Sequence, residues 1–114
     1  MNILKKYNIE VDRKIVSSND LEKQILVHFL AFWDKIKDIE EDLLPELMLV
    51  INEVLEFNDI GADVAGVAYV EKQNTRLIGS DLGHSNFTLP TNDFHEIILE
   101  WLSVLKNKNI KIYK

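Results

Sequence analysis

Two stripes of apolar side chains run along residues 20–40, and they constrain the fold more than any other feature of the sequence. The first stripe recurs at spacings of three and four residues and comprises Leu21, Ile25, Phe29, Phe32, Ile36 and Ile39. The second lies about a third of a turn round the same helix and comprises Leu26, Leu30 and Trp33. We therefore expect a helix from about Asp20 to about Glu40 that packs against a second helix on one side and a sheet on the other. Asn19 and Glu22 have the spacing of a capping box at its start.

A second helix is predicted to begin at Asp42 and Pro45 and to run to about Phe57. Proline is tolerated in a first helical turn, where its missing N–H would have no partner. Asn58 and Gly61 in "NDIGAD" can adopt the left-handed conformations of a helix end. On a helical projection one face of this segment should fill the core, and that face comprises Leu44, Leu47, Met48, Ile51, Val54 and Leu55.

The remaining segments have the patterns of strands and of a third helix. Alternation of apolar and polar residues predicts a half-buried strand over residues 7–16. "VAGVAYV" (64–70) is typical of a central strand and "LIGSDLG" (77–83) of its return strand, with "QNTR" as the turn between them. "NFTL" (86–89) indicates a short extra strand, and "IKIYK" (110–114) a final edge strand protected by lysines. The third helix, residues 90–109, has Asp93 and Glu96 at capping positions and a predicted buried stripe of Phe94, Ile97, Ile98, Trp101 and Leu105.

The predicted fold class is α+β, with three helices packed on a small, mostly antiparallel sheet in the order β-α-α-β-β-(β)-α-β. The length of 114 residues indicates a single domain over residues 1–114. The order of the strands does not follow from these patterns.

Composition excludes several classes of function. A net charge of −6 argues against nucleic acid or an anionic membrane as the partner, since both require clustered Lys and Arg. The chain has no Cys, so it has no disulfide or thiolate chemistry, and we expect no cofactor. No stretch has the length of a bilayer-spanning helix, and "MNILKKYNIEVDRK" lacks the features of a signal peptide. We therefore expect a cytoplasmic protein.

The acidic residues are concentrated in one part of the chain. Residues 38–63 contain nine Asp and Glu side chains and no Lys or Arg, so the rest of the chain sums to +3. On the predicted second helix, Leu49 and Phe57 fall among the glutamates, and Val50 lies at the edge of the same face. Apolar groups ringed by carboxylates suit a binding surface for a basic partner. The predicted partner-binding residues are Asp38, Glu40, Glu41, Asp42, Glu46, Leu49, Val50, Glu53, Glu56, Phe57, Asp59 and Asp63.

The alternative interpretation is a solvated acidic face, because acidic runs commonly keep proteins soluble and isolated exposed apolar residues are normal. A two-fold dimer on this face would oppose like charges, so we expect a monomer or a weak dimer when the protein is free.

Candidate catalytic residues are few. The pairs Asp81 with His84 and Asp93 with His95 would contribute to a metal site only if the fold brought them together, and zinc normally takes three or four protein ligands. His28, Trp33 and Trp101 lie in or beside apolar stripes and are interpreted as packing residues. We predict no catalytic residues and no metal site, so the chain is not expected to be an enzyme.

The C-terminal third, "GVAYVEKQNTRLIGSDLG…LPTNDFHEIILEWLSVLKNK", resembles small immunity proteins of contact-dependent growth inhibition and related polymorphic toxin systems. The shared pattern is a hairpin followed by an "LPTNDF"-like entry into a helix with an "LEWL" centre. The resemblance implies a bacterial cytoplasmic protein that binds and occludes one cognate toxin domain, often a basic nuclease. Two other functions stay open: a different acidic protein-binding module, such as a nucleic-acid mimic or an adaptor, and a small metal-dependent enzyme.

Overall fold

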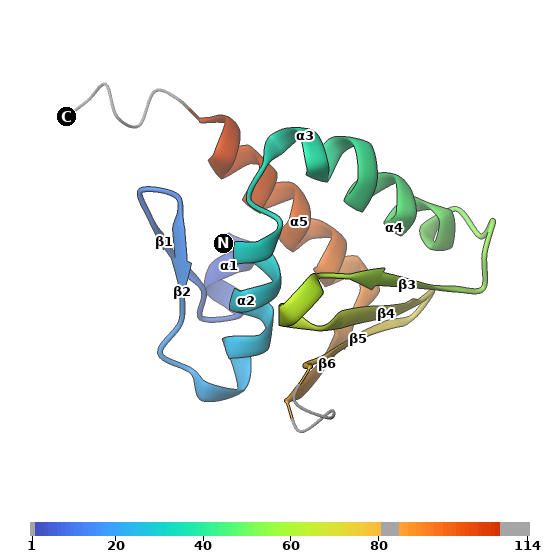
Figure 1. Cartoon of the computed structure of the whole chain (residues 1–114), viewed down its shortest axis with the longest axis horizontal. Coiled ribbons are helices and arrows are strands. Elements are labelled where there is room, and N and C mark those ends of the chain that lie inside the picture. Colours follow the sequence, from blue (N-terminus) through green and yellow to red (C-terminus); the bar gives the residue numbers. More distant parts are fainter. Residues whose placement is uncertain (1, 81–84, 108–114) are drawn as a thin grey trace.

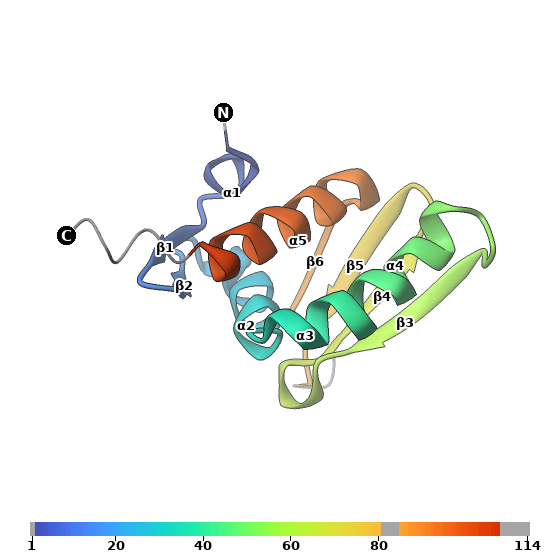
Figure 2. The same ribbon diagram turned by 90° about the horizontal axis from the view of Figure 1, so that it is seen from above.

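The computed structural model describes residues 2–80 and 85–107, and it confirms the α+β class (Figure 1). The larger sheet is antiparallel, with strands in the order β3-β4-β5-β6, formed by Phe57–Gly61, Val67–Glu71, Asn74–Ile78 and Asn86–Pro90. Helices α4 (Leu44–Ile51) and α5 (Thr91–Lys106) lie across one face of this sheet, as the two perpendicular views show (Figures 1 and 2). No described helix covers the opposite face.

The core lies between this sheet and its helical layer. The buried stripe predicted for the third helix is confirmed, since Phe94, Ile97, Ile98, Trp101 and Leu105 are all buried along α5. Buried and more exposed residues alternate along the strands, as expected for a sheet that is covered on one face. The buried residues on the covered face are Ile60, Ala68, Val70, Thr75, Leu77 and Leu89. Phe29 of α2 (Gln24–Phe32) meets Phe94 edge to face, with ring centroids 5.5 Å apart. α2 therefore closes one end of the core.

The single strand predicted over residues 7–16 is wrong. The chain forms α1 (Ile3–Lys6) and then a hairpin of β1 (Glu10–Asp12) and β2 (Ile15–Ser17), which is a separate two-stranded sheet. Arg13 and Lys14 connect the strands with φ angles of 54° and 65°. Two central residues with positive φ define the tight hairpin turn that usually contains Asn and Gly. Arg-Lys gives no such sequence signal.

The first long helix ends earlier than predicted. It begins with the 3-10 turn η1 (Leu21–Lys23), continues as α2, and stops at Phe32, because the chain leaves the helical conformation at Trp33. The Trp33 carbonyl accepts a hydrogen bond of 2.7 Å from the indole N–H of Trp101 on α5. The capping prediction also needs correction, since Asp20, rather than Asn19, accepts a hydrogen bond from the backbone N–H of Glu22.

The second helix begins and ends earlier than predicted. It comprises α3 (Ile36–Asp38), the π-helical turn η2 (Ile39–Leu43) and α4, so Pro45 lies inside it. Proline has no N–H to donate to the preceding turn, and the wider π turn directly before it accommodates the ring. The helix ends at Ile51 because Glu53 adopts a positive φ of 62°. Phe57, predicted as its last residue, is instead the first residue of β3.

The strand boundaries are also corrected. β3 was predicted as a helix end, and β5 begins at Asn74, so three of the four residues of the predicted "QNTR" turn are strand. The 3-10 turn η3 (Asp63–Ala65) and Gly66 connect β3 to β4, so the predicted central strand starts at Val67. β6 confirms the extra strand predicted at 86–89. Residues 81–83 of the predicted return strand and all of the final strand at 110–114 lie outside the described residues.

Candidate protein-binding surface

One helix carries most of the acidic segment on its solvent-exposed side. We name residues 36–51 the acidic helix. Its inward stripe, spaced by three and four residues, is buried and comprises Ile39, Leu43, Leu47 and Val50. Its exposed acidic side chains are Asp38, Glu40, Glu41, Asp42 and Glu46. The periodic burial explains how one segment combines a strongly apolar face with so much negative charge.

Few of these carboxylates have a charge partner. Glu40 pairs with Lys106 of α5 at 2.5 Å, and Glu53 pairs with Lys72 at 3.1 Å. Glu46 accepts a hydrogen bond of 2.8 Å from the side-chain amide of Asn58. The predicted acidic site residues that make no ion pair with any described residue are Asp38, Glu41, Asp42, Glu46, Glu56, Asp59 and Asp63. The charge along this side of the molecule is therefore largely uncompensated by the described cations.

The apolar residues of the predicted site do not share one exposed face. Val50 is 1 % exposed and belongs to the core, so it is not a contact residue, because the inward stripe of the helix runs through it. Leu49 is half-buried on the acidic helix. Val54 and Leu55, predicted to lie in the core, are 67 % and 40 % exposed in the turn after the helix. Their backbone N–H groups both donate to the Leu49 carbonyl, at 2.8 and 3.0 Å, so the three residues lie close together at the helix end, and we name them the apolar cap.

Glu53, Glu56 and Phe57 do not lie on the helix, since it ends before them. Glu53 and Glu56 are exposed in the turn, whereas Phe57 and Asp59 point to the uncovered face of the sheet. Phe57 is 61 % exposed. The predicted single face is thus two surfaces: the acidic helix with its apolar cap, and the uncovered face of the sheet.

The uncovered sheet face has a shallow groove of about 510 Å³. Its lining residues come from all four strands and are Phe57, Tyr69, Glu71, Asn74, Arg76, Ile78 and Thr88. The apolar run at residues 64–70 predicts a central strand that is apolar on both faces, whereas Tyr69 is 43 % exposed, so the sequence pattern did not predict this surface. The alternation of Tyr69 with buried Ala68 and Val70 is the signal that would have found it.

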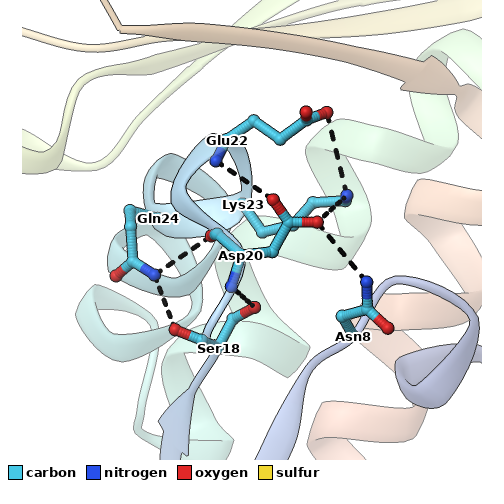
Figure 3. A network of polar contacts seen from close by, with 6 residues as sticks. All are labelled: Asn8, Ser18, Asp20, Glu22, Lys23 and Gln24. Carbon is cyan, nitrogen blue, oxygen red and sulfur yellow. Dashed lines mark hydrogen bonds and ion pairs between the residues drawn. The ribbon is translucent and has the colours of Figure 1, made fainter.

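A cavity of about 890 Å³ lies between the N-terminal segment and the end of α5. Asp20 and Asn8, at its edge, belong to a polar network that Figure 3 shows in detail. Asp20 accepts hydrogen bonds from the Lys23 ammonium at 2.9 Å and from the Asn8 amide at 3.4 Å, and the bond from Lys23 lowers the pKa of Asp20. The amide of Gln24 donates to the Ser18 carbonyl at 2.7 Å. Because these groups bind one another, we interpret the network as a structural connection between the hairpin and α2.

A second polar contact fixes α1 to the start of α5. The Tyr7 hydroxyl donates to the Asp93 carboxylate at 2.5 Å, and the Lys6 ammonium lies 3.1 Å from the same oxygen. Burial, together with the hydrogen bond and charge of Asp93, raises the pKa of Tyr7. The hydrogen bond from Tyr7 in turn lowers the pKa of Asp93. Asp93 therefore neither caps its helix through its side chain, as predicted, nor stands free as a metal ligand.

The other candidate ligands are not brought together. Burial lowers the pKa of His95, and Asp81 and His84 lie outside the described residues. Within residues 2–80 and 85–107, no three His, Asp or Glu side chains gather in a way that would hold a metal ion.

Comparison with known proteins returned no match to a family model, to a curated protein or to a solved structure. The helices within the described residues are too short or too polar for any of them to cross a membrane.

Proposed function

We propose that this chain is an immunity protein that binds a basic toxin domain through the acidic helix and its apolar cap, and so neutralises it. The observation that carries the proposal is the combination, on one continuous segment, of the exposed cap residues Val54 and Leu55 with three carboxylates that pair with no described cation, Asp38, Glu41 and Asp42. The proposed place of action is the cytoplasm, where such a toxin would reach its substrate.

Charge and apolar groups have separate roles in this proposal. Unpaired carboxylates steer a basic partner and raise its association rate to about 10⁸–10⁹ M⁻¹s⁻¹ at low salt. The cap supplies surface that loses water on contact and slows dissociation. A mimic of nucleic acid would need only the carboxylates. The exposed apolar cap therefore favours a protein-specific interface over nucleic-acid mimicry. The resemblance of the C-terminal third to immunity proteins supports the choice of a toxin as the partner.

The proposal predicts that a toxin domain is encoded beside this gene, and the test uses that domain as the immobilised partner. Asp38→Lys, Glu41→Lys and Asp42→Lys together should lower affinity about 100-fold, mainly through the association rate at low salt. The matched control carries the same charge change at the exposed carboxylates of the N-terminal third, with Glu10→Lys, Asp12→Lys and Glu22→Lys. We expect about a threefold effect from the control, since it makes the same change in net charge away from the acidic helix.

Two outcomes have different meanings. If the neighbouring toxin domain does not bind the wild-type chain at about 10 μM, the immunity function is wrong. If it binds but both triple variants behave alike, the function stands and the acidic helix is not the interface.

A further inference from the structure

The uncovered face of the four-stranded sheet is self-complementary, and we propose that it binds a second copy of this chain face to face, forming a weak two-fold dimer. This proposal goes beyond the toxin-binding function and depends on different residues. The observation behind it is the way in which the strand register arranges the outward side chains.

The register places these side chains in rows across the sheet. The central row is Asp59, Tyr69, Arg76 and Thr88, one residue from each strand in the order β3 to β6. The next row is Gly61, Val67, Ile78 and Asn86. Both carboxylates of the face, Asp59 and Glu71, belong to β3 and β4, whereas its cation, Arg76, belongs to β5. The two halves of the face therefore differ in charge across the line between β4 and β5.

A two-fold axis along that line, parallel to the strands, exchanges β4 with β5 and β3 with β6 while keeping each row. It places Arg76 of one copy over the ring of Tyr69 in the other, an arrangement that favours a cation–π contact. It places Val67 against Ile78, and Phe57 against Pro90 at the end of the face. It also brings the acidic half of each copy against the basic half of the other. This arrangement does not place like charges against each other, as a dimer through the acidic helix would.

The shape of the face agrees with this arrangement. Sheets stacked face to face lie about 10 Å apart, and their side chains interdigitate. The groove of about 510 Å³ among Phe57, Tyr69, Arg76 and Ile78 is the space that projecting side chains of the second copy would fill. Phe57 and Tyr69 line this groove and are 61 % and 43 % exposed. Both aromatic side chains would lose water on contact with the second copy.

Association through the sheet edge at β3 is blocked at its centre. The backbone N–H of Ala62 donates to the Gly66 carbonyl and so points towards β4. Successive N–H groups along an antiparallel strand point to alternate sides, so the N–H of Asp59, three residues earlier, points away from β4. That N–H donates instead to the side-chain oxygen of Asn58 at 3.0 Å. The amide of Asn58 is held in turn by the carboxylate of Glu46 at 2.8 Å. The strand edge is thus occupied by the chain's own side chains, which is a common protection against edge pairing.

The size of the face sets the expected strength. Four strands about 4.8 Å apart and five residues of about 3.4 Å give a flat area of roughly 300 Å² per copy. A stable interface buries about 800 Å² per partner, so the dimer should form only at tens to hundreds of micromolar. Each copy has a net charge of −6, and added salt should strengthen the dimer by screening this repulsion. Binding of a basic toxin would weaken with salt, which separates the two interactions.

Sedimentation velocity of the whole chain from about 20 μM to about 1 mM tests the proposal. The weight-average mass should rise from 13.2 kDa towards twice that value. Arg76→Glu should weaken the dimer at least about tenfold, because it places a carboxylate against Tyr69 and near Glu71 of the other copy. Lys35→Glu is the matched control, since it makes the same charge change at an exposed residue between α2 and α3.

An NMR dilution series provides the second measurement and does not depend on any variant. Amide signals of β4 and β5 should move with concentration, and those of the acidic helix should not. A chain that stays monomeric at about 1 mM overturns the proposal. A dimer that Arg76→Glu and Lys35→Glu weaken equally, or one whose concentration-dependent signals lie on the acidic helix, also overturns it.

Discussion

Gly66, between η3 and β4, should tolerate no side chain. Its φ of 116° lies in a region that residues with a Cβ rarely adopt. A Cβ built on Gly66 would lie 2.1 Å from the Ile78 carbonyl oxygen and 2.9 Å from the Gly79 Cα. Both neighbours are backbone, so they can move only if the β4–β5 pairing moves with them.

Gly66→Ala should therefore lower the free energy of unfolding by about 3 kcal/mol. The unfavourable backbone conformation costs about 1–3 kcal/mol, and displacement of Gly66 weakens its carbonyl's hydrogen bond from Ala62, worth about 1 kcal/mol. For a chain of 114 residues this corresponds to a fall in Tm of roughly 12 °C. Urea unfolding followed by far-UV circular dichroism measures the change through the midpoint at constant m.

Gly61→Ala is the matched control on the neighbouring strand. Nothing lies within 4 Å of a Cβ built at Gly61, and its φ is not positive. We expect its midpoint to stay within about 0.5 kcal/mol of the wild type. Equal midpoints for Gly66→Ala and the wild type would refute the strain argument, and so would equal losses in the two variants.

Three further predictions concern the N-terminal segment and its contact with α5. Replacing Arg13-Lys14 with Asn-Gly should raise the free energy of unfolding by about 0.5–1 kcal/mol, since both residues have positive φ; a lower urea midpoint would contradict this. The second concerns pH: the pKa of Asp93 is lowered in the folded state, so its contribution is full above the ordinary Asp pKa and is lost as pH falls through the lowered value. The stability gap between wild type and Asp93→Asn should therefore be constant near neutral pH and shrink below about pH 4 in urea titrations. Tyr7→Phe should cost about 1.5 kcal/mol at pH 7 and reduce that pH dependence, and an unchanged profile would contradict the role of the hydrogen bond.

The sequence predicts best where one local pattern decides the outcome. The stripe of α5 has helical period, and charged residues such as Glu96 and Glu100 lie off it, so the five predicted core residues are all buried. The fold class follows from the same kind of evidence, since helical periods alternate with short apolar runs. For a segment with the length and the helical period of α5, a helix is the assignment that fits.

Prediction fails where a distant contact or an unusual backbone conformation decides. Trp33 continues the helical pattern, but its carbonyl is bound by Trp101, which lies far along the chain. Glu53 ends a helix with a positive φ that local sequence normally assigns to Gly or Asn. Phe57 then pairs with Glu71 in an antiparallel ladder that single-sequence periodicity cannot show. The helix was predicted to end about six residues too late, and this one error explains why the predicted site residues from Glu53 to Phe57 do not lie on the helix.

The two proposed interfaces lie on opposite sides of the sheet, and this has a consequence for their relation. The acidic helix belongs to the helical layer (Figures 1 and 2). Tyr69 and Arg76 are paired across β4 and β5 and are exposed between buried neighbours, so they point to the uncovered face. A dimer through the sheet therefore leaves Asp38, Glu41 and Asp42 accessible to a basic partner. The two surfaces approach each other only at the turn, where Leu55 belongs to the apolar cap and Phe57 to the sheet face. Because the acidic helix and the uncovered face lie on opposite sides of the sheet, substitution of one surface should leave the other interaction unchanged, and at concentrations where the dimer forms, a bound complex should contain two copies of each chain.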